Sequence, residues 1–441
     1  MSDIWTSDAS RREFLKLAAA AGVAGTGALA LEAQAQNAPI NFYTWSAAVD
    51  LVKSHLTAFE ARTGLKVNYN NSPWAQYRDA MVTKFVGKAP LDVMWVSDSW
   101  LPEWAEAGWI APIDGFPDLM KYNADADDFC NKSMQYKGKQ YGLTYYSDYM
   151  AFFYDEEILK KAGIKAPPTT WDELVAQSLK IKGAGLSEYP MMLSMARESW
   201  LIEFLTAMVY SNGGRFTDDA GAALMADPKR GAQQALQWVV DAVNKHKIIS
   251  PACVETGELN GLKAFGAGNH AFALLSRYRV RTLNDPKQSA IAGRVKQALM
   301  PMGPGGSHAT VGWMRFHGMS AQAAADKNRA ANAAKLIEWF GGKAGSQYQF
   351  QKMLFSDLGT GFGVKELFKD PEVQANYKKY SDIAMFEKQQ QLARRKDVIA
   401  RWFGEWDEVN GTAWQSAVVG KSTVPAALKK SSDAWNDMRK S

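Results

Sequence analysis

The sequence predicts an α/β fold built on a parallel sheet, and residues 40–96 carry the pattern. Three strand-like segments alternate with two amphipathic helical segments, at residues 40–44, 49–63, 65–69, 77–85 and 91–96. In the first helix Val52, Leu56 and Phe59 recur at spacings of three and four, as one face of a helix requires. Strands and helices that alternate in this way form parallel sheets with right-handed crossovers.

The same pattern predicts where a ligand would bind. In open parallel sheets ligands bind beyond the carboxyl ends of the strands. The first strand ends at Trp45, and the apolar strand at 91–96 is followed by Asp98 and Trp100. We therefore expect a binding site at these residues.

The N-terminus has the pattern of an export signal. Residues 10–16 read S-R-R-E-F-L-K and are similar to the twin-arginine export motif, with Arg11 and Arg12 as its arginine pair. An Ala/Gly-rich stretch follows, too short to anchor in a bilayer, and Ala35 ends an A-x-A cleavage site. Residues 1–35 are therefore expected to be a signal peptide that the twin-arginine export machinery recognises, which places the mature chain in the periplasm.

Composition excludes some classes of partner. The 441 residues include 51 Lys and Arg against 46 Asp and Glu, a mild surplus that gives no reason to expect nucleic acid. Sixteen Trp and sixteen Tyr suggest stacking surfaces for ring-faced ligands, with a Trp-rich core as the alternative. Cys130 and Cys253 are expected to be unpaired, buried thiols, and no Cys/His cluster has metal-ligand spacing. We expect no cofactor.

The stretch from Lys137 to Leu174 carries the most specific pattern. A turn of small residues precedes an aromatic run from Tyr145 to Tyr154, and a short helix follows at 156–162. Thr170, with Glu173 three residues later, forms a capping box that opens the next helix.

This order resembles the segment by which extracellular solute-binding proteins of family 1, the maltose-binding-like proteins of bacterial ABC importers, pass from one lobe to the other. The residues in register with that family are Tyr141, Gly142, Tyr154, Asp155, Gly163, Pro168, Thr170, Trp171, Asp172, Glu173 and Leu174. Thr144 stands where the family usually has proline. Further family-like segments follow in order at 265–272, 300–306, 310–320 and 424–428, so the resemblance covers nearly all of the mature chain.

The resemblance implies a two-lobed, type II-like periplasmic binding protein fold with a ligand cleft between the lobes. Lobe I would comprise 36–145 and 317–362, and lobe II 146–316 and 363–441. Three hinge crossings are expected near 145–149, 311–316 and 361–365. A ligand that touches both lobes would stabilise a closed form, and the importer would read that closure. The chain is expected to be a monomer.

Candidate ligand-binding residues come from strand ends, crossings and family positions. They are Trp45, Asp98, Trp100, Tyr145, Asp148, Trp200, Arg277, Tyr278, Trp313, Arg315 and Trp406. Aromatic faces suit the apolar face of a sugar, while carboxylates and arginines suit its hydroxyls. Asp98 could instead cap the following helix, Asp148 could form a hydrogen bond within the hinge, and Trp406 could pack in the core.

Three arginines leave the charge of the ligand open. Arg277, Arg279 and Arg281 alternate along a predicted strand, and the plain interpretation is solvated charge. If one of them or Arg315 faces the cleft, an anionic solute such as a sugar acid or glycerol phosphate becomes an alternative, because arginine binds planar anions bidentately.

The sequence favours a binding protein over an enzyme. It contains no H-E-x-x-H, G-x-S-x-G or P-loop motif, and its paired aspartates are neighbours in loops. The predicted function is to capture a carbohydrate in the periplasm and deliver it to the transmembrane permease subunits of an ABC importer. A polyol ligand, a carbohydrate-active hydrolase or lyase, and a ligand sensor for signalling remain alternatives.

Overall fold

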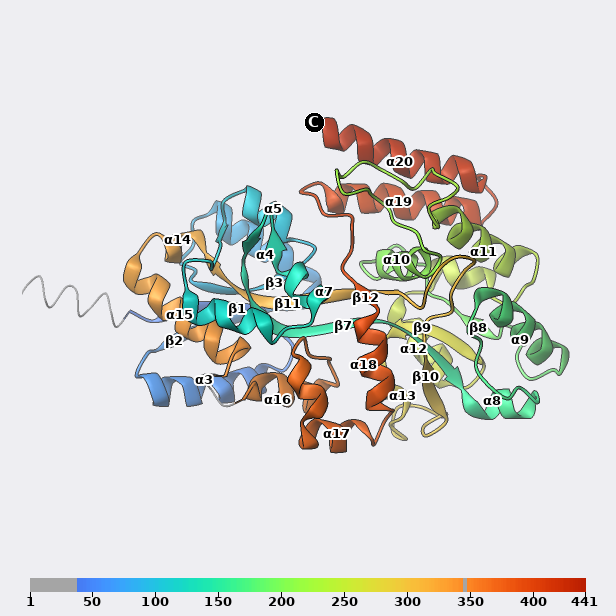
Figure 1. Ribbon diagram of the computed structural model, residues 1–441, viewed down its shortest axis with the longest axis horizontal. Coiled ribbons are helices and arrows are strands. Elements are labelled where there is room, and N and C mark those ends of the chain that lie inside the picture. The colour runs from blue at the N-terminus through green and yellow to red at the C-terminus, as the bar shows by residue number, and fades with distance from the viewer. Residues whose placement is uncertain (1–37, 344–346) are drawn as a thin grey trace, which may run out of the picture. The chain divides into compact units, whose positions relative to one another are not determined.

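The computed structural model describes residues 38–343 and 347–441 (Figure 1). Arg11, Arg12 and Ala35 of the predicted signal lie outside these residues. The described residues divide into two compact units, one of residues 38–94 with 319–336 and one of residues 95–318 with 337–343 and 347–441. The lobe boundaries expected from the family resemblance stay a prediction.

The first unit is the predicted parallel arrangement. Its elements are β1 (Ile40–Trp45), α3 (Val49–Thr63), β2 (Val67–Ser72), α4 (Trp74–Val86), the start of β3 (Val93–Ser97), α14 (Ala321–Ala324) and the start of α15 (Lys327–Gly341). Strand β1 pairs in parallel with both β2 and β3, which confirms the predicted parallel sheet. Helix α3 buries Val52, Leu56 and Phe59 and ends at Gly64, whose φ of 73° is left-handed.

The second unit is organised around one long strand, β7 (Gly142–Asp155). It pairs antiparallel with β11 (Thr310–Ser320), β9 (Phe272–Ser276) and β10 (Val295–Ala298). Two short strands add in parallel, β8 (Met191–Met192) to β9 and β12 (Ala393–Arg394) to β11. Every residue of β7 except Tyr154 is buried, as a strand covered on both faces should be.

Helices and short strands complete the second unit. They are α5 (Leu101–Glu106), β4 (Ile110–Ala111), α6 (Pro117–Met120), α7 (Asp128–Ser133), β5 (Gln135–Tyr136), β6 (Lys139–Gln140), α8 (Glu156–Lys161), α9 (Trp171–Gly183), α10 (Leu201–Ser211), α11 (Ala232–Asn244), α12 (Glu258–Gly266), α13 (Arg279–Leu283), α16 (Gln349–Leu358), α17 (Pro371–Tyr377), α18 (Ile383–Gln391), α19 (Phe403–Val418) and α20 (Val424–Lys440).

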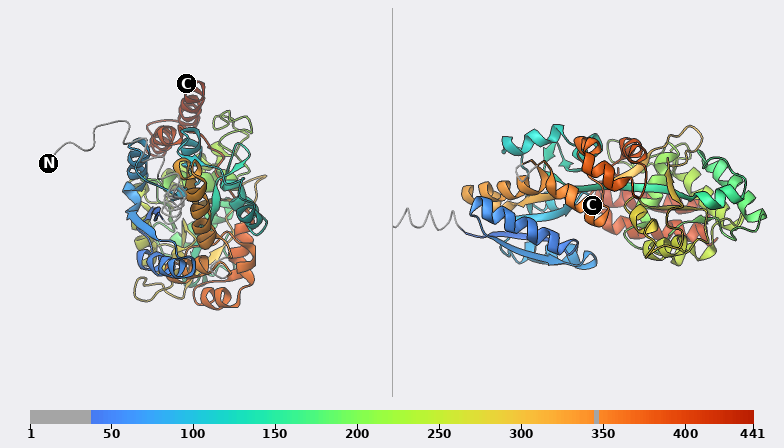
Figure 2. Two further views of the ribbon diagram at one scale, coloured as in Figure 1. Left: turned by 90° about the vertical axis from the view of Figure 1, so that its left-hand side faces the viewer. Right: turned by 90° about the horizontal axis from the view of Figure 1, so that it is seen from below.

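A helical layer of this unit combines the C-terminal helices α19 and α20 with α10 and α11. Helix α19 packs against α20, α11 and α10 (Figure 1), and the C-terminus lies at the end of α20 (Figure 2). All eleven residues of α10 are buried, because this helix lies inside the layer. Cys130 and Cys253 are buried and unpaired, as predicted.

The predicted capping box starts α9 with one change. The Glu173 amide donates to the Thr170 hydroxyl over 3.1 Å, so Thr170 is the cap. The Glu173 carboxylate accepts from the amide of Thr169 over 2.7 Å, one residue before the position that a standard capping box uses. In the described part of the chain, no helix has the length and apolar content that a membrane span needs.

Candidate functional site

The three predicted hinge crossings lie side by side in the second unit. In the antiparallel register of β7 and β11, Trp313 faces Asp148 and Arg315 faces Tyr146. The third crossing joins them through Gly361, whose amide donates to Asp148 Oδ2 over 3.0 Å. Segments far apart in sequence therefore meet at Asp148.

Asp148 is held by Arg277 in a fully buried ion pair. Arg277 Nε and Nη2 donate to the two carboxylate oxygens, each over 2.8 Å, and Nη2 also donates to the Gly359 carbonyl over 2.7 Å. Both side chains have no exposed surface, and the guanidinium lies 4.2 Å from the Phe386 ring centre. Burial opposes the charged form of Arg277, but the facing Asp148 carboxylate raises the pKa of Arg277 above its ordinary value. This placement favours the alternative in which Asp148 forms a hydrogen bond within the hinge. The interpretation of Arg277 as a solvated surface charge is wrong.

The expected alternation of three arginines along one strand is also wrong. Strand β9 ends at Ser276, and α13 starts at Arg279, so the backbone turns into a helix between them. Arg279 makes two 2.7 Å hydrogen bonds to Glu258, and Arg281 donates to the Ser356 carbonyl over 2.5 Å. Tyr278 is the residue before α13, and burial raises the pKa of its hydroxyl.

Asp98 and Arg315 form a second ion pair at the carboxyl end of β3. Arg315 Nη1 donates to Asp98 Oδ1 over 2.7 Å, and the carboxylate also accepts from the amides of Ser99 and Met314. Helix α5 has Trp100 at its N-cap position and no side-chain cap, so the capping alternative for Asp98 is wrong.

Tryptophans gather around this ion pair and its strand. Trp100 packs against Trp95 and Trp104, with ring centres 5.8 and 5.4 Å apart. On β11, Trp313 meets the ring of Trp200 edge-on at 5.4 Å. The structure therefore relates five predicted residues near β3 and β11: Asp98 pairs with Arg315, Trp200 packs against Trp313, and Trp100 follows Asp98 by two residues.

Other candidates lie elsewhere. Tyr145 is buried against His317 and Phe350, with ring centres 4.7 and 5.3 Å away. Trp406 is fully buried and donates its indole N–H to the Ser431 carbonyl over 3.0 Å, which favours the core-packing alternative.

Trp45 belongs to the first unit, at the carboxyl end of β1. There it meets Trp74 at 5.8 Å.

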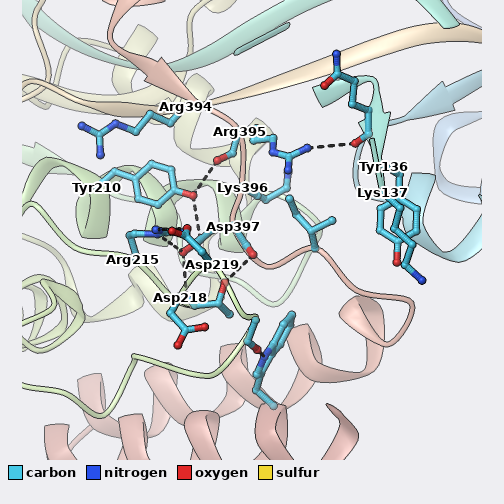
Figure 3. A pocket seen from close by; sticks show the side chains of 15 residues that line it. Tyr136, Lys137, Tyr210, Arg215, Asp218, Asp219, Arg394, Arg395, Lys396 and Asp397 are labelled. Carbon is cyan, nitrogen blue, oxygen red and sulfur yellow. Dashed lines mark hydrogen bonds and ion pairs between the residues drawn. The ribbon is translucent and has the colours of Figure 1, made fainter. Parts of the chain in front are cut away.

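A cavity of about 520 Å³ opens beside the segment after β12. We call it the basic cavity; its lining includes Tyr136, Lys137, Tyr210, Arg215, Asp218, Asp219, Arg394, Arg395, Lys396 and Asp397 (Figure 3). Tyr136 and Lys137 lie on the opposite side of it from Tyr210 and Arg215 (Figure 3). The volume is within the range of about 300 to 1,000 Å³ that is usual for small-molecule sites.

The basic cavity borders the Asp98 ion pair. A second, small cavity of about 20 Å³ is lined by Asp98 and shares Gln135, Arg395, Lys396 and Ile399 with the basic cavity. It is large enough for about one water molecule. The segment 395–399 therefore separates the Asp98 group from the larger cavity.

Buried charges hold this segment in place. Lys396 donates to Glu203 over 2.5 Å, and both side chains are buried. Asp397 accepts from the Tyr210 hydroxyl over 2.9 Å and from the Phe216 amide over 2.7 Å. Burial, assisted by the charge of Glu203, raises the pKa of Asp407 to about 7.

Sequence reasoning missed the basic cavity. Its signal is the run Arg394-Arg395-Lys396-Asp397, three consecutive cations followed by a carboxylate. The run forms part of a two-residue strand and a loop, which no hydrophobic period reveals.

Comparison with known proteins gives consistent matches. The family model described as bacterial extracellular solute-binding protein matches residues 40–347. A protein of Deinococcus radiodurans named "Probable ABC transporter-binding protein" is 30% identical over 244 residues, which are 54% of each chain.

Solved structures match over most of the chain. Maltose-bound MalE3 of T. maritima has a TM-score of 0.76 at 22% identity and covers 91% of this chain and 99% of its own. A solute-binding protein of Agrobacterium vitis with bound D-mannitol has a TM-score of 0.69 at 21% identity and covers 91% and 98%. These likenesses confirm the predicted α/β fold class.

Proposed function

Because the chain belongs to the bacterial extracellular solute-binding protein family, we propose that it captures a carbohydrate-like solute and delivers it to the permease of an ABC importer. Members of this family serve transport, and the matched structures hold maltose and D-mannitol. A sugar or sugar-derived polyol is therefore the class of ligand that we propose for this chain.

The observation that carries the proposal is the group of polar and aromatic residues beside the basic cavity. Asp98 and Arg315 offer a carboxylate and a guanidinium, while Trp100 and Trp200 offer aromatic faces. Sugars need both kinds of partner, because hydroxyls ring an apolar C–H surface. In our proposal the solute binds in the basic cavity beside this group, and closure across the three crossings around Asp148 retains it.

The proposal includes no chemical step and assigns export to the N-terminal segment. Replacing Arg11 and Arg12 together with lysine should leave the chain in the cytoplasm when periplasmic and cytoplasmic fractions are compared. Appearance of the double variant in the periplasm would refute the twin-arginine route.

A thermal-shift screen of the mature chain from Gln36 tests the proposed function. The panel holds mono- and oligosaccharides, polyols, sugar acids and sugar phosphates. A ligand at a hundred times its Kd adds about 2.7 kcal/mol to stability, which gives a clear shift. The shift should disappear in Trp200→Ala and persist in Trp238→Ala, a half-buried tryptophan outside the group.

If no ligand of the panel shifts the melting temperature, the transport proposal is refuted. Cleavage of an oligosaccharide during incubation would do the same in favour of a hydrolase.

A further inference from the structure

Cationic side chains are the commonest charged groups in the lining of the basic cavity. Five cationic side chains line it, Lys137, Arg215, Arg394, Arg395 and Lys396, against three carboxylates, those of Asp218, Asp219 and Asp397. Cations in a concave site attract anions most strongly where no carboxylate already pairs with them.

Three of the five cations are already neutralised by the protein. Arg215 pairs with Asp219 over 2.8 Å, and Lys137 pairs with Glu106 over 2.9 Å. Lys396 pairs with Glu203 over 2.5 Å. The cations that remain are Arg394 and Arg395, which are adjacent in sequence.

The two other carboxylates of the lining, Asp397 and Asp218, are held by donors other than Arg394 and Arg395. Asp397 accepts from Tyr210 and from the amides of Phe216 and Thr217, so its oxygens are occupied. Asp218 accepts from the Ala222 amide over 2.8 Å.

Arg395 is half-buried and its hydrogen-bond partners are neutral. Its Nη1 donates to the carbonyls of Lys132 over 2.6 Å and Gln135 over 3.2 Å. Burial lowers the pKa of Arg395 below its ordinary value. Within residues 38–343 and 347–441 neither Arg395 nor the exposed Arg394 forms an ion pair with a carboxylate.

Four other buried or partly buried arginines of the chain pair with a carboxylate, whereas the partly buried Arg281, like Arg395, donates to backbone carbonyls. Arg277, Arg279, Arg315 and Arg329 each contact a carboxylate at 2.6 to 2.8 Å. A guanidinium removed from water is stable only when an anion or several acceptors replace that water. Arg395 has two carbonyl acceptors and the nearby charge of Asp98 but no directly paired anion, and a ligand oxyanion would supply that partner.

We propose that the solute carries an oxyanion group, a carboxylate or a phosphate, which Arg394 and Arg395 bind in the basic cavity. This inference rests on the proposed function and narrows its substrate to an acidic carbohydrate. Guanidinium groups suit this role because their planar donors match oxyanions bidentately. The arginines that the sequence singled out cannot supply the site, because Asp148, Glu258 and Asp98 occupy Arg277, Arg279 and Arg315.

Calorimetric titration of the mature chain with matched ligands tests the inference. The probes are glucose, glucuronate and glucose 6-phosphate, together with any neutral sugar that shifts the melting temperature. One of the two acids should bind at least about tenfold more tightly than its neutral counterpart, since a charge-assisted hydrogen bond is worth about 1.5–3 kcal/mol. The carboxylate and phosphate arms identify which oxyanion fits.

Variants locate the effect. Arg395→Gln and Arg394→Gln should each weaken acid binding by about 10- to 100-fold and leave neutral-sugar binding unchanged. Arg394 has an exposed side chain, so its variant keeps the fold even if Arg395→Gln disturbs the loop. Arg401→Gln is the matched control, with the same charge change on an exposed residue outside the cavity lining.

The outcomes separate the inference from the proposed function. Neutral sugars that bind as well as the acids, or acid binding that survives both cavity variants, would overturn the inference and leave the transport role intact. An equal loss in Arg401→Gln would also overturn it, since the effect would then be one of net charge. Binding to no member of the panel would defeat both.

Discussion

Replacing Arg277 with methionine should destabilise the chain severely. The change removes three charge-assisted hydrogen bonds, two to Asp148 and one to the Gly359 carbonyl, and leaves the Asp148 carboxylate fully buried. Removing one partner of a buried pair costs about 3–5 kcal/mol. That is a large part of the roughly 5–15 kcal/mol by which domains are usually stable.

The pH dependence of this variant follows from the orphaned carboxylate. Burial raises the pKa of Asp148, and loss of Arg277 raises it further. The folded variant therefore holds a proton that the unfolded chain releases above its ordinary pKa of about 3.9. Stability falls as pH rises through that window, so the loss should be smaller at pH 5 than at pH 8.

Urea unfolding of four proteins measures the effect: the mature chain, Arg277→Met, Asp148→Asn and the double variant. Because Asn cannot carry the orphan charge, the double variant should recover at least about 2 kcal/mol relative to the sum of the single changes. Lys429→Met, which breaks an exposed pair with Asp433, should leave stability nearly unchanged. A loss below about 1 kcal/mol in Arg277→Met, or strict additivity, would refute the reasoning.

Three further changes test local features. Thr170→Ala removes the cap of α9 and should lower the unfolding free energy by about 1 kcal/mol in urea, whereas an unchanged midpoint would contradict the capping role. Gly142→Ala places a methyl group 2.2 Å from the His317 carbonyl oxygen, so poor yield of folded protein is expected, and a normal melting temperature would argue against this β7–β11 contact. Asp407→Asn removes a carboxyl whose pKa of about 7 exceeds its unfolded value, so it should stabilise the chain at pH 8 and make no difference near pH 4. Equal stability of wild type and Asp407→Asn at pH 8 would contradict that burial.

Local sequence patterns predicted those helices and strands in which the spacing of apolar residues follows a single clear pattern. Val52, Leu56 and Phe59 mark α3, and the buried β3 follows from a continuous apolar run. Hydrophobic period and caps decide such segments locally, so the sequence alone suffices.

Contacts between segments that are far apart in the sequence determine the features that local patterns did not predict. From the sequence alone, Arg277 is interpreted as a solvated surface charge. In the structure it is buried, because the fold places Asp148 and Gly359 beside it. Strand β12 has only two residues, and its pairing with Thr310 and Val311 fixes where Arg395 lies. No local pattern in residues 393–397 predicts that pairing. The basic cavity therefore could not be predicted from the sequence.

The predicted site residues show the same contrast between features that a sequence rule predicts and features that distant contacts decide. Asp98 and Trp100 follow from the rule that ligands bind at strand ends, and they lie together with Arg315 on β11. Trp406 matches a family position, yet it is buried in the helical layer. A family motif gives a position in the chain, while neighbouring side chains decide what the residue contacts.

The most direct test of the transport account is calorimetric titration with the best ligand of the panel, followed by recovery of that ligand. The account predicts saturable binding of one solute molecule per chain, and chromatography should return the solute chemically unchanged. Heat that continues to be released or absorbed after each injection, together with a chemically altered product in the recovered fraction, would contradict the account and identify an enzyme.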